Sequence, residues 1–106
     1  MTDKRLVLTT CGSSDEARRI ARDIVERRLA ACVNIVPQIE SIYRWEGAVE
    51  TAGEWLLIIK TTADAFDKLR DAIEAAHSYD LPECVAVAVE DGGIPYLEWI
   101  GSAVVS

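Results

Sequence analysis

The order of apolar patterns along the chain is the feature that most limits its possible folds. Short runs rich in β-branched residues, typical of strands, alternate with apolar residues at helical spacing, typical of amphipathic helices. The strand-like runs span residues 5–11, 30–47, 54–62 and 83–90, with one helical pattern after the first run and another after the third. This βαββαβ order predicts an α+β fold of the ferredoxin-like type, in which both helices cover one face of a four-stranded sheet.

Both helical patterns have expected starts and inner faces. Ser13 and Glu16 have the spacing of a capping box, and Thr62 is the expected N-cap of the second helix. We expect His77 in the last turn of that helix, because Leu81 precedes a proline and is kept out of the helical conformation. The predicted inner faces comprise Ala17, Ile20, Ala21, Ile24, Val25 and Leu29 in the first helix, and Ala65, Phe66, Leu69, Ala72, Ile73 and Ala76 in the second.

Residues 30–62 indicate a long hairpin. Pro37 cannot donate a hydrogen bond to a neighbouring strand, so it predicts an edge position or a bulge. Gly47 or Gly53 is expected at the turn. Residues 54–62 are apolar on both faces, which predicts a central strand, and residues 94–105 indicate an extra C-terminal helix with Pro95 near its start. One side of the first hairpin strand is expected to hold Ile35, Pro37, Ile39, Ser41, Tyr43 and Trp45.

Length and composition indicate one domain in the cytoplasm. A chain of 106 residues, half of them hydrophobic, suffices for one core, so residues 1–106 are expected to form a single domain. No apolar run is long enough to cross a membrane, and the N-terminal residues lack the pattern of a secretory signal. Cys11, Cys32 and Cys84 are far apart and odd in number, which argues against a disulfide framework or a zinc ribbon.

The charge of the chain argues against a nucleic-acid partner. The formal net charge is −7, whereas nucleic-acid binding needs a basic surface. An RNA-recognition domain shares the βαββαβ order, but its aromatic and basic strand motif is missing from this sequence. Five arginines gather in the first helical pattern, where a solvated helix face is expected: Arg18, Arg19, Arg22, Arg27 and Arg28.

The predicted fold leaves open the sheet face opposite the two helices. A chain of this length has only the short C-terminal helix left to cover it, and the hairpin also carries Tyr43, Trp45 and Trp55. Open apolar faces of this kind are rare in monomers, so we expect self-association. The alternative is that the C-terminal helix covers the sheet and the aromatic side chains form ordinary cross-strand pairs.

Five strings of the sequence resemble, in this order, the signature segments of the CutA divalent-cation tolerance family: LAACVNI, SIYRWEG, LLIIKTT, HSYDLPEC and YLEWI. The resemblance implies a ferredoxin-like fold, a tight cytoplasmic homotrimer, a role in the response to copper and other divalent metals, and a superficial likeness to the PII signalling trimers. It implies no enzymatic activity. The sequence itself has neither a phosphate-binding glycine loop nor an evident serine–histidine–carboxylate grouping.

Cys11, His77 and Glu83 are the predicted metal-binding residues. They flank the ends of the first and fourth strands, which are neighbours in the predicted sheet. A sulfur combined with an imidazole favours copper(I) or zinc over magnesium. The resemblance supports the same residues, Glu83 least, and suggests a weakly bound copper or other divalent ion with no essential cofactor. The alternatives are a core cysteine, a histidine that ends a helix, and a carboxylate that caps a turn.

Polar and aromatic residues in the other family-like strings suggest a second kind of site. Tyr43, Arg44, Trp45, Lys60 and Trp99 could form an inter-subunit cleft, in which Arg44 and Lys60 bind an anionic ligand as in a PII-like sensor. The alternative is simple packing between subunits. A third hypothesis is a trimeric scaffold that presents its hairpins to an unidentified protein partner.

Overall fold

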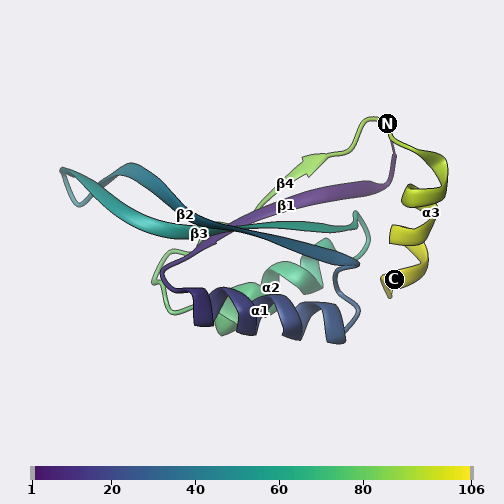
Figure 1. The fold of residues 1–106 in the computed structure, drawn as a ribbon, viewed down its shortest axis with the longest axis horizontal. Helices are drawn as coiled ribbons and strands as arrows, with labels where there is room; N and C mark the ends of the chain where they lie inside the picture. Colours follow the sequence, from purple (N-terminus) through teal and green to yellow (C-terminus); the bar gives the residue numbers. More distant parts are fainter. Residues whose placement is uncertain (1, 106) are drawn as a thin grey trace.

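A computed structural model describes residues 2–105 and has the predicted α+β, ferredoxin-like fold. One four-stranded antiparallel sheet carries helices α1 and α2 on one face, and helix α3 lies at one end of the sheet (Figure 1). The elements are β1 (Lys4–Cys11), α1 (Ser14–Glu26), β2 (Cys32–Trp45), β3 (Ala48–Thr62), α2 (Phe66–Ala76), β4 (Val85–Ala88) and α3 (Ile94–Ala103). The predicted element order is therefore confirmed, including the long hairpin and the extra C-terminal helix. Among the described residues, none of the helices has the length and apolar character that crossing a bilayer requires.

β3 and β1 are the central strands of the sheet, whose order is β2-β3-β1-β4. The central position predicted for residues 54–62 is thus confirmed. β1 ends with Cys11 opposite Trp55 of β3. Alternate residues of these strands face the helices, and among them Val7, Leu57 and Ile59 are fully buried. The buried helix residues of the same core include Ile20, Ile24, Leu69 and Ile73.

A β-bulge interrupts β2 where Pro37 predicted an irregularity. The pairing of β2 with β3 shifts register between Val36 and Ile39, because β2 has one residue more than β3 at this point. The prediction that Ile35 and Tyr43 share one side of the strand is therefore wrong. The extra residue reverses the faces to which the later side chains of β2 point. Ile35 therefore packs against the core, whereas Tyr43 is exposed.

Local hydrogen bonds set the starts of the two main helices. Ser13 is the N-cap of α1, and its hydroxyl accepts a hydrogen bond from the Glu16 amide, as the capping-box spacing predicted. The prediction of Thr62 as the N-cap of α2 is wrong. The Thr62 hydroxyl accepts from the Ala65 amide in the turn before the helix, and the helix begins only at Phe66.

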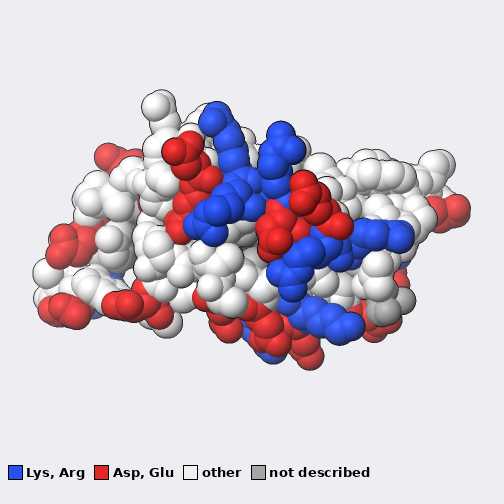
Figure 2. Space-filling model, turned by 90° about the horizontal axis from the view of Figure 1, so that it is seen from below, with Lys and Arg blue, Asp and Glu red and all other residues white. Residues whose placement is uncertain are grey.

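The outer face of α1 is charged and solvated, as predicted for Arg18, Arg19 and Arg22, whereas Arg27 and Arg28 follow the end of the helix. Figure 2 shows basic side chains interspersed with acidic ones on the helix side of the molecule. Arg27 pairs with Asp23, and Arg19 lies 3.6 Å from Glu16. Val25, which was predicted to face inward, is 38% exposed. It lies at the edge of the apolar stripe of the helix, where the sheet no longer covers it.

The sheet face opposite α1 and α2 stays largely uncovered within one chain. Val85 and Val87 of β4 lie on this face and are 49% and 48% exposed. Helix α3 covers only one end of the sheet, where Ile100 and Val104 form a small second core with Ala65. The alternative in which the C-terminal helix covers the open face therefore does not hold for β4.

Arg28 fastens the C-terminal end of α3 to the loop after α1. Its guanidinium donates to the carbonyl oxygens of Ser102 at 2.7 Å and Ala103 at 3.2 Å. Its own carbonyl oxygen accepts from the Val105 amide at 2.8 Å. The last carbonyls of a helix have no partner inside the helix, so a cation at this end both satisfies them and interacts favourably with the helix dipole.

Replacing Arg28 with alanine is expected to loosen α3 without unfolding the sheet. The loss of two exposed, charge-assisted hydrogen bonds should cost about 1 kcal/mol and speed amide exchange in α3 about fivefold. Hydrogen-exchange mass spectrometry of the segment 94–105 measures the effect. Arg27→Ala is the matched control, since Arg27 pairs with Asp23 on α1. Equal exchange rates in the two variants would contradict the role of Arg28.

Candidate functional site

Three potential metal ligands meet where β1, α1 and α2 come together. Cys11 is the last residue of β1, Glu16 lies in the first turn of α1, and His77 directly follows α2. Their ligand atoms, a sulfur, a carboxylate oxygen and a ring nitrogen, all lie within 4.8 Å of one another. The side chains of Cys11 and His77 are fully buried, and Glu16 is 8% exposed. We call these three residues the donor triad.

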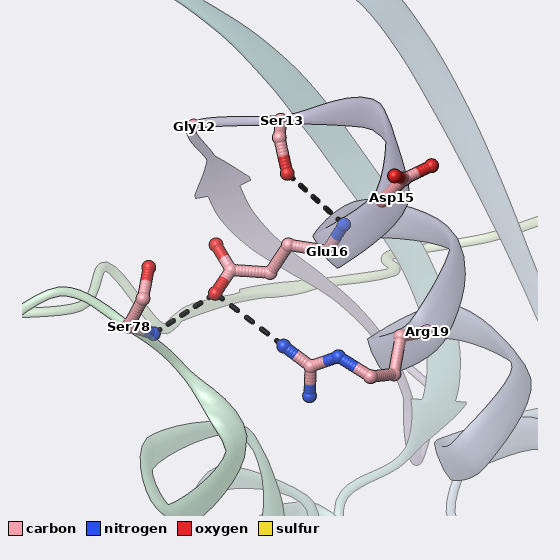
Figure 3. A pocket seen from close by; sticks show the side chains of 6 residues that line it. All are labelled: Gly12, Ser13, Asp15, Glu16, Arg19 and Ser78. Carbon is pink, nitrogen blue, oxygen red and sulfur yellow. Dashed lines mark hydrogen bonds and ion pairs between the residues drawn. The ribbon is translucent and has the colours of Figure 1, made fainter.

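Glu16 belongs to α1, but its carboxylate reaches the loop after α2. Its Oε2 accepts a hydrogen bond from the Ser78 amide at 3.0 Å and lies 3.6 Å from Arg19 Nη2 (Figure 3). Burial opposes the charge of Glu16, but the hydrogen bonds from Ser78, together with the charge of Arg19, outweigh it and lower the pKa. Glu16 is therefore an ionised anchor for the loop that contains His77.

His77 is held between two backbone groups. Its Nε2 lies 2.7 Å from the Thr10 carbonyl oxygen, and the Tyr79 amide donates to its Nδ1 at 3.1 Å. A carbonyl can only accept and an amide can only donate, so these partners assign the neutral tautomer with its hydrogen on Nε2. The expectation that His77 belongs to the last turn of α2 is wrong. The backbone of His77 is extended. The hydrogen bonds of its ring hold it against β1 and the following loop instead.

Cys11 is a thiol rather than a thiolate at neutral pH. Burial, followed by the negative charge of Glu16, raises its pKa to about 11. Sulfur binds metals as the thiolate, so an ion that binds Cys11 must displace a proton. The other two cysteines, Cys32 and Cys84, are free and partly buried, and Cys84 packs against the core.

A hollow of about 640 Å³ lies on the open face of the sheet, beside the hairpin. We call it the hairpin hollow. Inside it, the Tyr79 hydroxyl donates to Oε2 of Glu54 at 2.7 Å. Gly12 leaves room for this ring, since a Cβ at that position would lie 3.1 Å from the hydroxyl oxygen. The residues that line the hollow are Thr10, Ser41, Ile42, Tyr43, Arg44, Trp45, Glu54, Tyr79, Asp80, Leu81 and Glu83.

Two groups in the hairpin hollow have raised pKa values. Burial, and then the hydrogen bond to Glu54, raises the pKa of Tyr79. Burial, and then the negative charge of Glu54, raises the pKa of Glu83. Both shifts have the same origin, because the hollow is partly desolvated and already contains the Glu54 carboxylate.

The structure brings together two of the three residues predicted to bind metal. Cys11 and His77 belong to the donor triad, whereas Glu83 lies in the hairpin hollow near Glu54. Glu16 supplies the carboxylate of the triad. The structure therefore contains one buried group with sulfur, oxygen and nitrogen donors and, separately, a more open group of carboxylates.

The residues predicted to line an inter-subunit cleft fall into two groups. Three of them line the hairpin hollow: Tyr43, Arg44 and Trp45. Of the other two, Trp99 belongs to α3 and Lys60 lies beside this helix. Lys60 Nζ is 5.5 Å from the centre of the Tyr96 ring, and that ring is 5.4 Å from the ring of Trp99. Within one chain, Arg44 and Lys60 therefore belong to different surfaces.

Sequence reasoning missed Glu16, Glu54 and Tyr79. Glu16 was interpreted only as part of a helix cap, because of its spacing from Ser13. Glu54 was interpreted only as the first residue of a strand. The available signal was Tyr79, which lies in the string HSYDLPEC two residues after His77. An aromatic hydroxyl so close to a candidate ligand was a candidate to hold the loop in place.

Comparison with known proteins gives consistent matches over nearly the whole chain. The family described as CutA1 divalent ion tolerance protein matches residues 5–103. The divalent-cation tolerance protein CutA of Thermus thermophilus is 50% identical over 97 residues, which cover 92% of this chain and 94% of that protein. Protein CutA of Homo sapiens is 46% identical over 91 residues, which are 86% of this chain and 51% of that protein, so the chain spans about half the length of this relative.

Solved structures give the same result. CutA1 from Thermus thermophilus has a TM-score of 0.94 at 48% identity, with 95% of this chain and 98% of that chain covered. CutA from Xylella fastidiosa has a TM-score of 0.95 at 41% identity, with 97% and 99% covered. A structure from Archaeoglobus fulgidus, described as a periplasmic divalent cation tolerance protein, has a TM-score of 0.91 at 41% identity, with 94% and 97% covered. The fold, the extent of these matches and their identity together show that the chain belongs to the CutA1 divalent ion tolerance family.

Proposed function

We propose that the protein serves divalent-cation tolerance by binding a metal ion at the donor triad, without catalysing a reaction. The observation that carries this proposal is the approach of the Cys11, Glu16 and His77 donor atoms to within 4.8 Å of one another. Membership of the divalent ion tolerance family supports the general role. The location that we propose for this role is the triad.

The types of ligand atom in the triad suit copper(I) or zinc. Both ions accept sulfur and imidazole, and zinc also takes carboxylate. The lone pair of His77 is on Nδ1, which lies 4.0 Å from Glu16 Oε1. A bound ion would displace the Cys11 proton and the hydrogen bond from Tyr79, so we expect weak binding and no essential cofactor. Glu83 is the alternative carboxylate ligand, and its use would require the loop before β4 to move.

We further propose that the working form is a cytoplasmic homotrimer. Ile42, Val49 and Leu81 are 67%, 64% and 73% exposed in the single chain, and self-association would remove such apolar surface from water. Three free cysteines fit a reducing compartment. Light scattering on the purified protein should give three times the mass of one chain. The mass of a single chain would contradict the trimer.

A PII-like sensor of an anionic ligand has less support. It would use Arg44 and Lys60 together, but Lys60 lies beside Tyr96 and α3. Arg44 shares the hairpin hollow with three carboxylates, those of Glu54, Asp80 and Glu83, whose charge opposes anion binding. The scaffold hypothesis predicts no metal-dependent event at the triad, so the experiment below also tests it.

Zinc titrated into the reduced protein is expected to bind once per chain and to release a proton, because Cys11 starts as a thiol. Cys11→Ser, Glu16→Gln and His77→Ala should each weaken binding at least about tenfold, the usual effect of losing one metal ligand or its partner. Isothermal calorimetry in two buffers of different ionisation enthalpy measures both the affinity and the proton release. A copper(I) competitor assay on the same proteins compares the two metals.

Cys32→Ser is the matched control for the thiol, since Cys32 lies outside the triad. It should keep the wild-type affinity. Equal binding by wild type, Cys11→Ser and His77→Ala would contradict the proposal and place the metal elsewhere. Weakening by Glu83→Gln but not by Glu16→Gln would move the carboxylate ligand to Glu83.

A further inference from the structure

Tyr79 contacts the donor triad with its backbone and the hairpin hollow with its side chain. Its amide donates to His77 Nδ1 at 3.1 Å, and its hydroxyl donates to Glu54 Oε2 at 2.7 Å. The rings of His77 and Tyr79 also pack together, with centroids 4.6 Å apart. Any displacement of Tyr79 therefore changes the triad and the hollow at the same time.

The two places lie on opposite faces of the sheet. Cys11 faces the helices with the rest of the core, whereas Thr10, its neighbour in β1, lines the hairpin hollow. Successive side chains of a strand point to opposite faces, so β1 separates the two places. The loop of residues 77–84 connects α2 to β4 past the end of β1. Tyr79 in this loop contacts both the donor triad and the hairpin hollow.

An ion bound to His77 needs the nitrogen that the Tyr79 amide now occupies. Nε2 carries the hydrogen that points at the Thr10 carbonyl, so the lone pair of the ring is on Nδ1. Nδ1 also lies 4.0 Å from Oε1 of Glu16. One lone pair cannot accept a hydrogen bond and bind a metal together, so metal binding must release the amide of Tyr79.

We propose that Tyr79 couples metal binding at the donor triad to the state of the hairpin hollow, an inference that rests on the proposed function. When an ion takes Nδ1, the amide of Tyr79 leaves it, the residue shifts, and its hydroxyl withdraws from Glu54. Glu54 then loses a hydrogen-bond donor beside Glu83, which changes both the shape and the polarity of the hollow. Such coupling is reciprocal, so the bond between Tyr79 and Glu54 opposes metal binding.

Tyr79→Phe tests this coupling because it removes the hydroxyl and keeps the ring and the amide. Zinc affinity should rise about fivefold, the equivalent of one net hydrogen bond that no longer has to break. Nuclear magnetic resonance of the ¹⁵N-labelled full chain supplies the second readout. In the wild type, the amide signals of Tyr43 and Trp45 in the hollow should shift as zinc saturates the protein. In Tyr79→Phe, zinc should bind and shift these two signals less, because no hydrogen bond to Glu54 breaks.

Tyr43→Phe is the matched control, since it removes another hydroxyl from the same hollow. Its zinc affinity and the response of the Trp45 signal should equal those of the wild type. Unchanged or weaker zinc binding by Tyr79→Phe, or a hollow response as large as that of the wild type, would overturn the coupling. Wild-type zinc binding without any hollow response would overturn the coupling alone. A wild type that binds no zinc at the triad would overturn the proposed function and the coupling together.

Discussion

Replacing His77 with phenylalanine is expected to lower the free energy of unfolding by about 2 kcal/mol, because it leaves two partly buried backbone groups without partners. The Thr10 carbonyl loses the Nε2 donor, and the Tyr79 amide loses the Nδ1 acceptor. Phenylalanine is larger than histidine and leaves no cavity, so the loss reports the unpaired groups together with the strain of fitting the larger ring. Guanidinium denaturation of the metal-free protein, at one fixed protein concentration, measures the change.

His77→Gln is the informative companion variant. Its side-chain amide can restore the donor to the Thr10 carbonyl but has no acceptor where Nδ1 was, so about half of the loss should return. A phenylalanine variant as stable as the wild type would contradict the assignment of His77 as a structural bridge. Because the experiment uses no metal, it separates this bridging role from the proposed ligand role.

Raising the pH from 9 to 11 is expected to destabilise the protein by about 2 kcal/mol through Cys11. Burial raises the pKa of the folded thiol from 9.0 to about 11, so in this range the unfolded chain loses its proton while the folded chain keeps it. The unfolded state then binds fewer protons, and the free energy of unfolding falls as the pH rises. Well below pH 9 the thiol is protonated in both states and its contribution is fully present. The raised pKa of Tyr79 acts in the same direction at higher pH.

Denaturation curves recorded at pH 8.5, 9.5 and 10.5 test this expectation. Cys11→Ala has no group that titrates at this position, so its stability should fall less steeply over the same pH range than that of the wild type. Identical slopes in the two proteins would show that Cys11 does not carry the alkaline loss.

The order of the elements was predictable because each apolar pattern is local. Residues 54–62 are apolar on both faces and do lie at the centre of the sheet, and the spacing of Ser13 and Glu16 does mark the start of α1. The effect of Pro37 was only partly predictable. A proline indicates an irregular strand, but the side on which later residues lie depends on how many residues the bulge inserts, and the pairing with β3 decides that number.

The candidate site was less predictable than the fold, since it depends on the path of a loop. The neighbouring positions of the first and fourth strands were enough to bring Cys11 and His77 together. They were not enough to choose between Glu16 and Glu83, because both carboxylates lie close in sequence to the same strand ends. The choice follows from hydrogen bonds that the Ser78 and Tyr79 amides donate to Glu16 and His77. An irregular segment has no periodic signal that predicts such contacts.

The central place of β1 in the sheet has a consequence for protein synthesis. This strand leaves the ribosome before the other strands of the sheet, yet its partners, β3 and β4, extend to Thr62 and Ala88. The β2–β3 hairpin can form from local contacts, but the backbone groups of β1 remain unpaired until β3 has been synthesised. The apolar face of α1 remains exposed to water over the same period. During synthesis of this fold, we therefore expect β1 and α1 to be the elements that most need protection from aggregation.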